Sequence, residues 1–402
     1  MKENNFRQNL YEFAFMILAV KNILNSSTLI KCPEWVDMLL IMVFLGFIVW
    51  KLALQTYTWG RFFFFTGFAI LCAYTCVKAE YFYLLFSFLG IIAIQDVELK
   101  EVVKKTSRIK IALLLLHVIV YFVTMLISPE KIIFFYRDGV MRHYFMLGHP
   151  NTFSMYVLWT SLEFIYARYE KLRIPNLLFI WLINAITYYF TNSNTSIMVS
   201  TLVVTLFVLD KWGKKKLIAF IIPVSKYCFT ACTILIPLLI VSYTKLSAGM
   251  LEMFNMLDSF FSGRLLYGAY AYDKYGFSLI GRTIIFAKKT FWHGHWFDSI
   301  FFDNSYIWMF ILYGYIYLIV ISSAFIWISK KTTTVEKVLI IAFTFYGVME
   351  TYVINAAICF PLFFIGKYLY VAIQEKREKK LSNKYANCIR RKGRGNCLGL
   401  EI

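Results

Sequence analysis

The first residues suited to chemistry lie just before an apolar block, in the segment 136–151. Arg142 is followed by an apolar stretch and then by His149-Pro150-Asn151. Proline suits the first turn of a helix, and asparagine is a good helix cap, so a helix is predicted to start here. A helix N-terminus also favours an anion. His149 is therefore either a polar residue in an ordinary loop-to-helix cap or a general base or phosphate contact.

A second set of such residues lies around the segment 244–303. Arginine grips phosphate with paired hydrogen bonds and stays charged at any working pH. Arg142, Arg264 and Arg282 are therefore predicted to surround a diphosphate. Asp303 precedes a predicted helix, so it is either the N-cap of that helix or a carboxylate that faces these arginines.

Two further features bear on the same region. His293 and His295, with Asp298 nearby, have the spacing of a zinc-binding pair, but the spacing places no third ligand. We therefore expect neither a metal nor a cofactor. Placing the charged side chain of Glu350 in hydrocarbon costs free energy. Because Glu350 falls near the outer end of a predicted helix, it is a candidate to line the same site.

The composition excludes a soluble globular enzyme, a disordered chain and a fibrous repeat. The 402 residues are 60% hydrophobic and 16% charged, against about 45–50% and about 25% in ordinary soluble domains. The apolar residues form long blocks, and the natural solvent of such blocks is lipid. The sequence therefore predicts an all-α integral membrane protein.

The sequence contains about 12 apolar blocks of roughly 20 residues, each long enough to cross a bilayer. Lys and Arg concentrate in every second connection, which predicts that both termini are cytoplasmic. The predicted helices are 11–30, 35–54, 62–77, 80–96, 109–128, 151–167, 175–191, 195–210, 217–243, 304–328, 335–352 and 355–373.

This arrangement divides the chain into a polytopic membrane domain, 1–373, and a basic cytoplasmic tail, 374–402, that lies against anionic lipid or is disordered. Two connections on the outer side are long, 129–150 and 244–303, and we expect them to cap an active site. The second, between helices 9 and 10, is rich in aromatic residues and predicts short amphipathic helices on the outer membrane face.

These features together resemble the Wzy-type polysaccharide polymerases of capsule and O-antigen assembly, which are related to the O-antigen ligases. The resemblance covers most of the chain in architecture, with a large outer loop late in a multi-helix membrane protein. Its motifs are short: Gly148-His-Pro-Asn151 preceded by Arg142, Gly263-Arg264, and Gly294-His295 followed by Asp303-Asn-Ser-Tyr306 and Gly314.

The resemblance implies a GT-C-like glycosyltransferase in the bacterial plasma membrane, with its active site facing outward. The growing glycan on undecaprenyl diphosphate would be transferred to a new lipid-linked repeat unit, without a metal. Fixed guanidinium groups would stabilise the charge left on the diphosphate, and His149 or Asp303 would act as the base for the acceptor hydroxyl.

From these arguments we expect two sets of site residues. Arg142, His149, Arg264 and Asp303 are the expected catalytic residues. The expected substrate-binding residues are Asn151, Arg282, His295, Asn304 and Tyr306. The expected partners are the lipid-linked donor and acceptor, the bilayer and a chain-length regulator, with no nucleic acid.

Two other functions fit the sequence. An O-antigen-type ligase would use the same donor with a different acceptor. A flippase or transporter of lipid-linked oligosaccharides would also need many helices, but it should carry charged residues through the depth of the membrane and have two similar halves.

Overall fold

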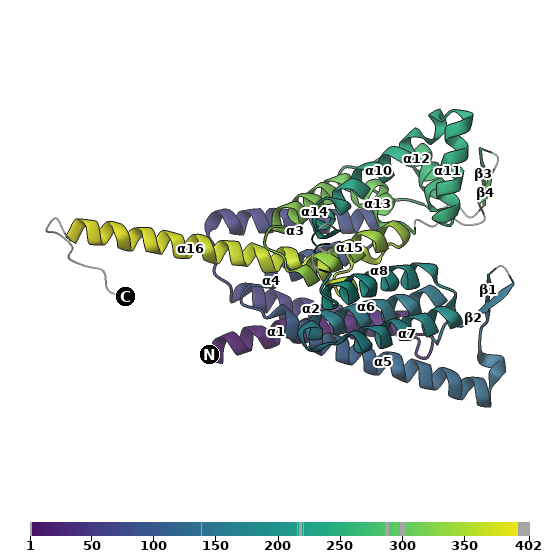
Figure 1. Ribbon diagram of the computed structural model, residues 1–402, viewed down its shortest axis with the longest axis horizontal. Coiled ribbons are helices and arrows are strands. Elements are labelled where there is room, and N and C mark those ends of the chain that lie inside the picture. The colour runs from purple at the N-terminus through teal and green to yellow at the C-terminus, as the bar shows by residue number, and fades with distance from the viewer. Residues whose placement is uncertain are drawn as a thin grey trace.

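The fold is a bundle of helices that carries two small β-hairpins at one end (Figure 1). The structure is a computed structural model, and it describes residues 2–137, 139–214, 216, 219, 221–285, 289–293, 295–297 and 303–392. The predicted all-α class is confirmed for this part of the chain.

The first half of the chain forms eight helices and one hairpin, labelled as in Figure 1. The helices are α1 (Lys2–Ser26), α2 (Glu34–Ala53), α3 (Trp59–Ala79), α4 (Tyr83–Ala93), α5 (Leu99–Ile127), α6 (Pro150–Arg168), α7 (Ile174–Thr191) and α8 (Asn194–Lys211). The antiparallel hairpin, β1 (Phe135–Arg137) and β2 (Val140–Arg142), lies between α5 and α6 and pairs Phe135 with Arg142.

The second half adds the remaining helices and the other hairpin. The helices are α10 (Cys228–Ser242), α11 (Ala248–Phe260), α12 (Arg264–Tyr275), α13 (Ser305–Trp308), α14 (Tyr315–Ile328), α15 (Thr334–Met349) and α16 (Phe363–Lys392). The hairpin pairs β3 (Thr290–Trp292) with β4 (His295–Phe297). As predicted, the long segment 244–303 contains short helices, α11 and α12.

All twelve predicted segments coincide at least partly with helices. Among the described residues, six helices are long and apolar enough to cross a membrane: α2, α3, α5, α7, α8 and a 22-residue helical segment, Val224–Lys245, that includes α10. The chain is therefore a helical protein suited to a membrane. Twelve crossings and the sidedness of the termini stay predictions.

The predicted helix over 304–328 is interrupted in the structure. The segment 304–328 breaks at Gly314, whose φ is +123° and where a Cβ atom would lie 2.3 Å from the carbonyl oxygen of Leu279. Ser278 explains this break, because its N–H donates to Phe310 O (3.0 Å) and its carbonyl accepts from Tyr315 N (2.8 Å). The connecting segment is thus bonded into the gap between α13 and α14.

The last helix also differs from its predicted bounds. Residues 350–362 contain two short 3₁₀ turns, Tyr352–Ile354 and Phe360–Leu362, and α16 begins only at Phe363. It then continues through Lys392, past the expected boundary at 373. No glycine or proline occurs between Lys367 and Lys392, and Lys, Glu and Ala favour helix, so nothing in the sequence ends the helix earlier.

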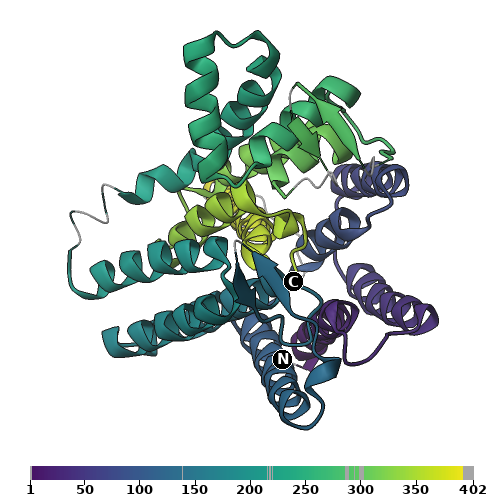
Figure 2. The ribbon, with the colours of Figure 1, turned by 90° about the vertical axis from the view of Figure 1, so that its right-hand side faces the viewer.

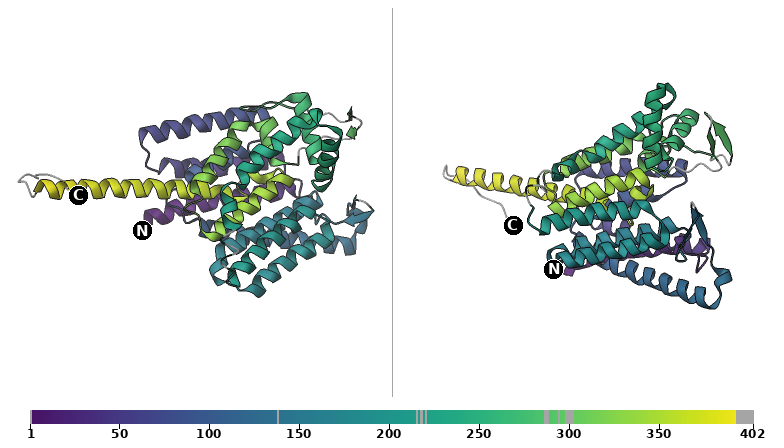
Figure 3. Two further views of the ribbon diagram at one scale, coloured as in Figure 1. Left: turned by 45° about the horizontal axis from the view of Figure 1, so that its top comes forward. Right: turned by 45° about the vertical axis from the view of Figure 1, so that its right-hand side comes forward.

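The ends of the bundle differ in what they carry. Both hairpins lie at one end, whereas the N-terminus and the free end of α16 lie at the other (Figure 1). Seen from the hairpin end, the C-terminal part of the chain lies near the centre with earlier helices around it (Figure 2). Two tilted views show α16 projecting beyond the other helices (Figure 3).

Candidate functional site

The hairpin end brings together charged and polar residues from six separate parts of the chain. They come from the strand β2, the start of α6, the start of α8, the turn between α11 and α12, the residues just before α13, and the end of α15. The first of these carries Arg142, the turn carries Arg264, and the end of α15 carries Glu350.

Arg142 is buried and held by two hydrogen bonds. Its Nε donates to the carbonyl of Thr191 at the end of α7 (2.7 Å), and Nη2 donates to Oδ1 of Asn151 (2.5 Å). Nη1 has no hydrogen-bond partner among the described residues. Burial lowers the pKa of Arg142, with a further contribution from Arg137, but an arginine remains charged at physiological pH. Arg142 is thus a cation held in a fixed position, and its Nη1 group can donate a hydrogen bond to a ligand.

His149 is the N-cap of α6. Its Nδ1 accepts a hydrogen bond from the N–H of Asn151 (3.1 Å). Because a backbone N–H can only donate, Nδ1 carries no proton, and the proton of the neutral ring lies on Nε2. Burial, and then Arg142, lower the pKa of His149 to about 4. At neutral pH this side chain therefore offers an N–H donor rather than a basic nitrogen.

Arg264 opens α12 directly after Gly263, whose φ of +82° sets the turn. The turn is fixed by Asp258 at the end of α11, which accepts from the N–H groups of Leu265 (2.8 Å) and Leu266 (3.0 Å). Nε of Arg264 donates to the carbonyl of Asp303 (2.9 Å), and Nη1 donates to Phe261 O (3.1 Å). The guanidinium is thereby aimed toward the end of α15.

Glu350 follows the last residue of α15 and faces both arginines. Its Oε1 lies 3.6 Å from Nη2 of Arg264 and accepts a hydrogen bond from the hydroxyl of Thr195 (3.2 Å). Arg142 also interacts electrostatically with this carboxyl group. Burial nevertheless raises the pKa of Glu350 to about 8, because desolvation outweighs the attraction of the arginines.

Asp303 is the exposed acid of the cluster. Its Oδ2 lies 4.0 Å from Nη2 of Arg264, and 52% of its side chain is exposed. Desolvation still raises its pKa, against the effect of Arg264. With about half of the side chain exposed, a solute can reach this carboxyl group.

The charge balance of this cluster favours an anion. With Glu350 protonated below pH 8, the cluster holds two guanidinium groups and one other carboxyl group, that of Asp303. The cluster then has an excess positive charge in a partly desolvated setting, where charge–charge attraction is stronger than in water. A phosphate or diphosphate group meets the charge and the donor geometry of such a site.

The other expected residues have different positions. Asn304, not Asp303, is the N-cap of α13, and Tyr306 is buried with its hydroxyl donating to Thr344 O (3.2 Å). Nδ2 of Asn304 donates to Val348 O (2.6 Å). Both side chains are bonded inside the protein, so they clamp the 303–306 segment against α15 and position Asp303 and Glu350.

Arg282 is not placed with the two arginines, and the position of the His295 side chain is not described. The guanidinium of Arg282 donates to the carbonyls of Tyr275 and Phe277, which braces its own loop. Among the described residues, no hydrogen bond or ion pair connects Arg282 to Arg142, Arg264 or Glu350. The backbone of His295 lies in β4, but its side chain is outside the described part of the chain, as is Asp298.

Sequence reasoning missed two neighbours of Glu350. Thr195, at the start of α8, donates a hydrogen bond to its carboxyl group, and Tyr352, in the turn after Glu350, interacts with that group electrostatically. Burial, and then Glu350, raise the pKa of Tyr352 to about 12. Both could have been found from the sequence, because each is a polar residue at the end of a predicted helix, on the side predicted to be the outer one.

Comparison with known proteins adds no identity. No family model, no curated protein and no solved structure matches this chain. Within the described residues, no group of three or more His, Cys, Asp or Glu side chains is gathered as metal ligands would be. The geometry around Glu350 is therefore the main indication of function.

Proposed function

We propose that this chain is a glycosyltransferase of the bacterial plasma membrane that polymerises undecaprenyl-diphosphate-linked oligosaccharide repeat units into a capsular or O-antigen polysaccharide. One observation carries the proposal. At one end of an apolar helical bundle, Arg264 lies 3.6 Å from the buried carboxyl group of Glu350, and Arg142, from a separate connection, interacts electrostatically with the same group.

In this reaction the two arginines would stabilise the negative charge that develops on the leaving diphosphate. The acceptor hydroxyl oxygen attacks the anomeric carbon of the donor, and the bond from that carbon to the diphosphate oxygen breaks. The electron pair stays on the departing undecaprenyl diphosphate. Guanidinium groups that are already fixed in place stabilise this charge without reorganising during the reaction, and both Arg142 and Arg264 are fixed by carbonyl oxygens.

The positions of the two candidate bases favour Asp303. Its side chain is about half exposed, so the carboxylate can accept the proton of the acceptor hydroxyl. His149 uses its unprotonated nitrogen to cap α6, so its Nε2–H suits a phosphate oxygen instead. We therefore assign the base to Asp303 and a hydrogen-bond donor to His149.

The architecture suits a substrate that is half lipid and half sugar. Apolar helices able to span a bilayer support a site at the end of the bundle, so the polyprenyl chain can stay in lipid while the glycan is in water. The distribution of Lys and Arg among the loops predicts that this end lies outside the cell. A chain-length regulator would be a partner at the same face.

The direct test removes one arginine. Lipid-linked repeat units, extracted from a host strain that lacks this protein, are incubated with purified protein in liposomes, and products are resolved as a ladder on a gel. Arg264→Ala should abolish the ladder. Lys274→Ala is the matched control, because it removes an exposed cation from the same helix and should leave the ladder unchanged. A normal ladder from Arg264→Ala would refute the proposal.

The same assay separates the related functions. Transfer to the lipid A core without formation of a ladder would identify a ligase. Movement of the intact lipid-linked unit across the liposome membrane, with no new glycosidic bond, would identify a flippase.

The sidedness needs its own experiment. Met256 on α11 is 71% exposed at the hairpin end, so Met256→Cys in a Cys32→Ser background should react with an impermeant maleimide in intact cells. Labelling that occurs only after lysis would place the site at the inner face of the membrane.

A further inference from the structure

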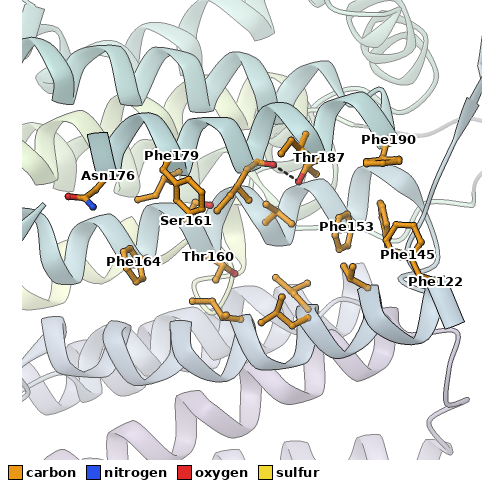
Figure 4. Close-up of a pocket in the computed structure, with 18 of the residues that line it drawn as sticks. Phe122, Phe145, Phe153, Thr160, Ser161, Phe164, Asn176, Phe179, Thr187 and Phe190 are labelled. Carbon is orange, nitrogen blue, oxygen red and sulfur yellow. Dashed lines mark hydrogen bonds between the residues drawn. The ribbon is translucent and has the colours of Figure 1, made fainter. Parts of the chain in front are cut away.

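An apolar groove runs along the helices α5, α6 and α7, with a cavity volume of about 590 Å³. Figure 4 shows Phe122, Phe145, Phe153 and Phe190 together at one end, with Phe164 and Asn176 toward the other. The proposed catalytic chemistry uses none of these side chains, so the groove needs a separate explanation.

The groove is built from one face of each helix. Its α6 residues are Phe153, Val157, Thr160, Ser161 and Phe164, which recur at the helical spacing of three or four. The floor is buried, as at Phe153 and Ile180, whereas the rim is exposed, with Ile183 at 40%. Since α5 and α7 are both candidate membrane spans, the open side of the groove faces lipid.

The groove has the length expected for an extended chain. Its α7 residues run from Asn176 to Phe190, which corresponds to about 21 Å at 1.5 Å per residue. The hydrocarbon core of a bilayer is about 30 Å thick. The groove therefore follows most of one membrane crossing, which fits a long flexible chain better than a compact ligand.

One end of the groove leads to the arginine site. Phe190, at that end, accepts a hydrogen bond from the N–H of His143 (2.8 Å) through its carbonyl. The next residue, Thr191, accepts from Nε of Arg142 (2.7 Å). Phe145 packs on Phe153 there, with ring centroids 4.3 Å apart. A chain lying in the groove would thus have its polar end beside a fixed guanidinium.

We infer that this groove binds the polyprenyl chain of the lipid diphosphate, with the diphosphate at Arg142. The inference rests on the proposed function and deepens it by giving the lipid part of the substrate its own binding surface. The apolar groove accounts for the isoprenoid chain, and the cation at its end accounts for the anionic head. A neutral lipid would leave that cation without a counterpart.

The experiment measures binding rather than catalysis. Radiolabelled undecaprenyl diphosphate is bound to purified protein in phosphatidylcholine nanodiscs, with unlabelled undecaprenyl diphosphate, phosphatidylglycerol or inorganic diphosphate as competitors. Ile183→Trp and Ile186→Trp fill the groove from its exposed rim. Leu182→Trp is the matched control, because Leu182 is the neighbouring residue, is 47% exposed and does not line the groove.

We expect each of the two groove variants to bind about tenfold more weakly than the wild type. That loss equals the free energy of burying about two methylene groups of the lipid chain. Leu182→Trp should bind as the wild type does. Equal binding by all four proteins would overturn the inference. Equal competition by phosphatidylglycerol would also overturn it, because the groove would then hold ordinary membrane lipid.

The outcome is separable from that of the proposed function. If the wild-type protein polymerises and Ile183→Trp binds normally, the groove inference fails alone. If undecaprenyl diphosphate binds in the groove but no ladder ever forms, the proposed function fails and the groove inference stands. Thermal unfolding of each variant identifies any that has lost its fold, and the second groove variant then decides.

Discussion

The guanidinium of Arg264 lies 3.6 Å from the carboxyl group of Glu350, and both side chains are about nine-tenths buried. A buried ion pair is favourable only where its attraction exceeds the cost of desolvating both charges. Here desolvation prevails, since the pKa of Glu350 is raised to about 8. At neutral pH the carboxyl group is mostly protonated, and Arg264 retains its capacity to bind an anion.

The first prediction concerns pH. A carboxyl group with a pKa near 8 is neutral below that pH and negative above it, so the affinity for a polyprenyl diphosphate should fall as the pH rises from 7 to 9. We expect a loss of about tenfold, equivalent to about 1.4 kcal/mol of added repulsion. Equilibrium binding of undecaprenyl diphosphate across this range measures it.

The control for this prediction is Glu350→Gln. Glutamine imitates the protonated carboxyl group, so the variant should bind at least as tightly as the wild type at pH 7 and should lose the fall above pH 8. Any pH dependence that belongs to the diphosphate itself will remain in both proteins. An unchanged profile in the variant would assign the titration to another group.

The second prediction separates the two candidate bases. Asp303→Asn removes the proposed base and should reduce the turnover number by about 10²–10⁴-fold while binding of the donor is retained. His149→Asn keeps a good helix cap but removes the Nε2–H, so it should mainly raise the KM for the donor. Steady-state kinetics on lipid-linked repeat units distinguishes them, and the opposite pattern would exchange the two roles.

The architecture could be predicted from the sequence because it depends on local patterns. Apolar blocks predict helices, and Pro150 predicts where one begins, as α6 does at that residue. The break at Gly314 could not be predicted, because it depends on Ser278 bonding into the helix from a distant segment. The end of α16 was placed too early because a change from apolar to basic residues does not by itself end a helix.

The site was predictable in its residue types and only partly in its partners. Arg142 and Arg264 were identifiable because they lie in connections predicted to be outside the cell, where the charge rule for membrane topology does not require cations. Arg282 has the same character in sequence, yet its guanidinium is used by the carbonyls of its own loop. Sequence cannot distinguish an arginine that braces a loop from one that faces a ligand, since the difference lies in tertiary contacts.

The third prediction concerns the positioning of Arg142. Asn151 accepts from Nη2 of Arg142 at 2.5 Å, and hydrogen bonds to charged groups contribute about 1.5–3 kcal/mol. Asn151→Ala should therefore raise the KM for the donor about tenfold, with a smaller change in kcat. Asn151→Asp keeps an acceptor at the same place but adds a negative charge beside the diphosphate, so it should not restore the affinity. An unchanged KM in Asn151→Ala would show that this hydrogen bond does not position Arg142.

The last prediction concerns a buried ion pair away from the site. Lys110 on α5 contacts Glu163 on α6 at 2.5 Å and also donates to the carbonyl of Ala357 (2.6 Å), and both side chains are almost fully buried. Removing one partner leaves the other charge unpaired in an apolar interior, at a cost of about 3–5 kcal/mol. Lys110→Met should therefore lower the thermal unfolding temperature in detergent by several degrees.

The double variant makes this prediction specific to the pair. Replacing Glu163 by Gln together with Lys110→Met removes both charges, so no unpaired ion remains and much of the lost stability should return. The recovery should be incomplete, because the bond from Lys110 to the 350–362 segment is still absent. If the double variant is as unstable as the sum of the single variants, the two charges do not interact in the folded protein, and the bond to Ala357 is what stabilises the bundle.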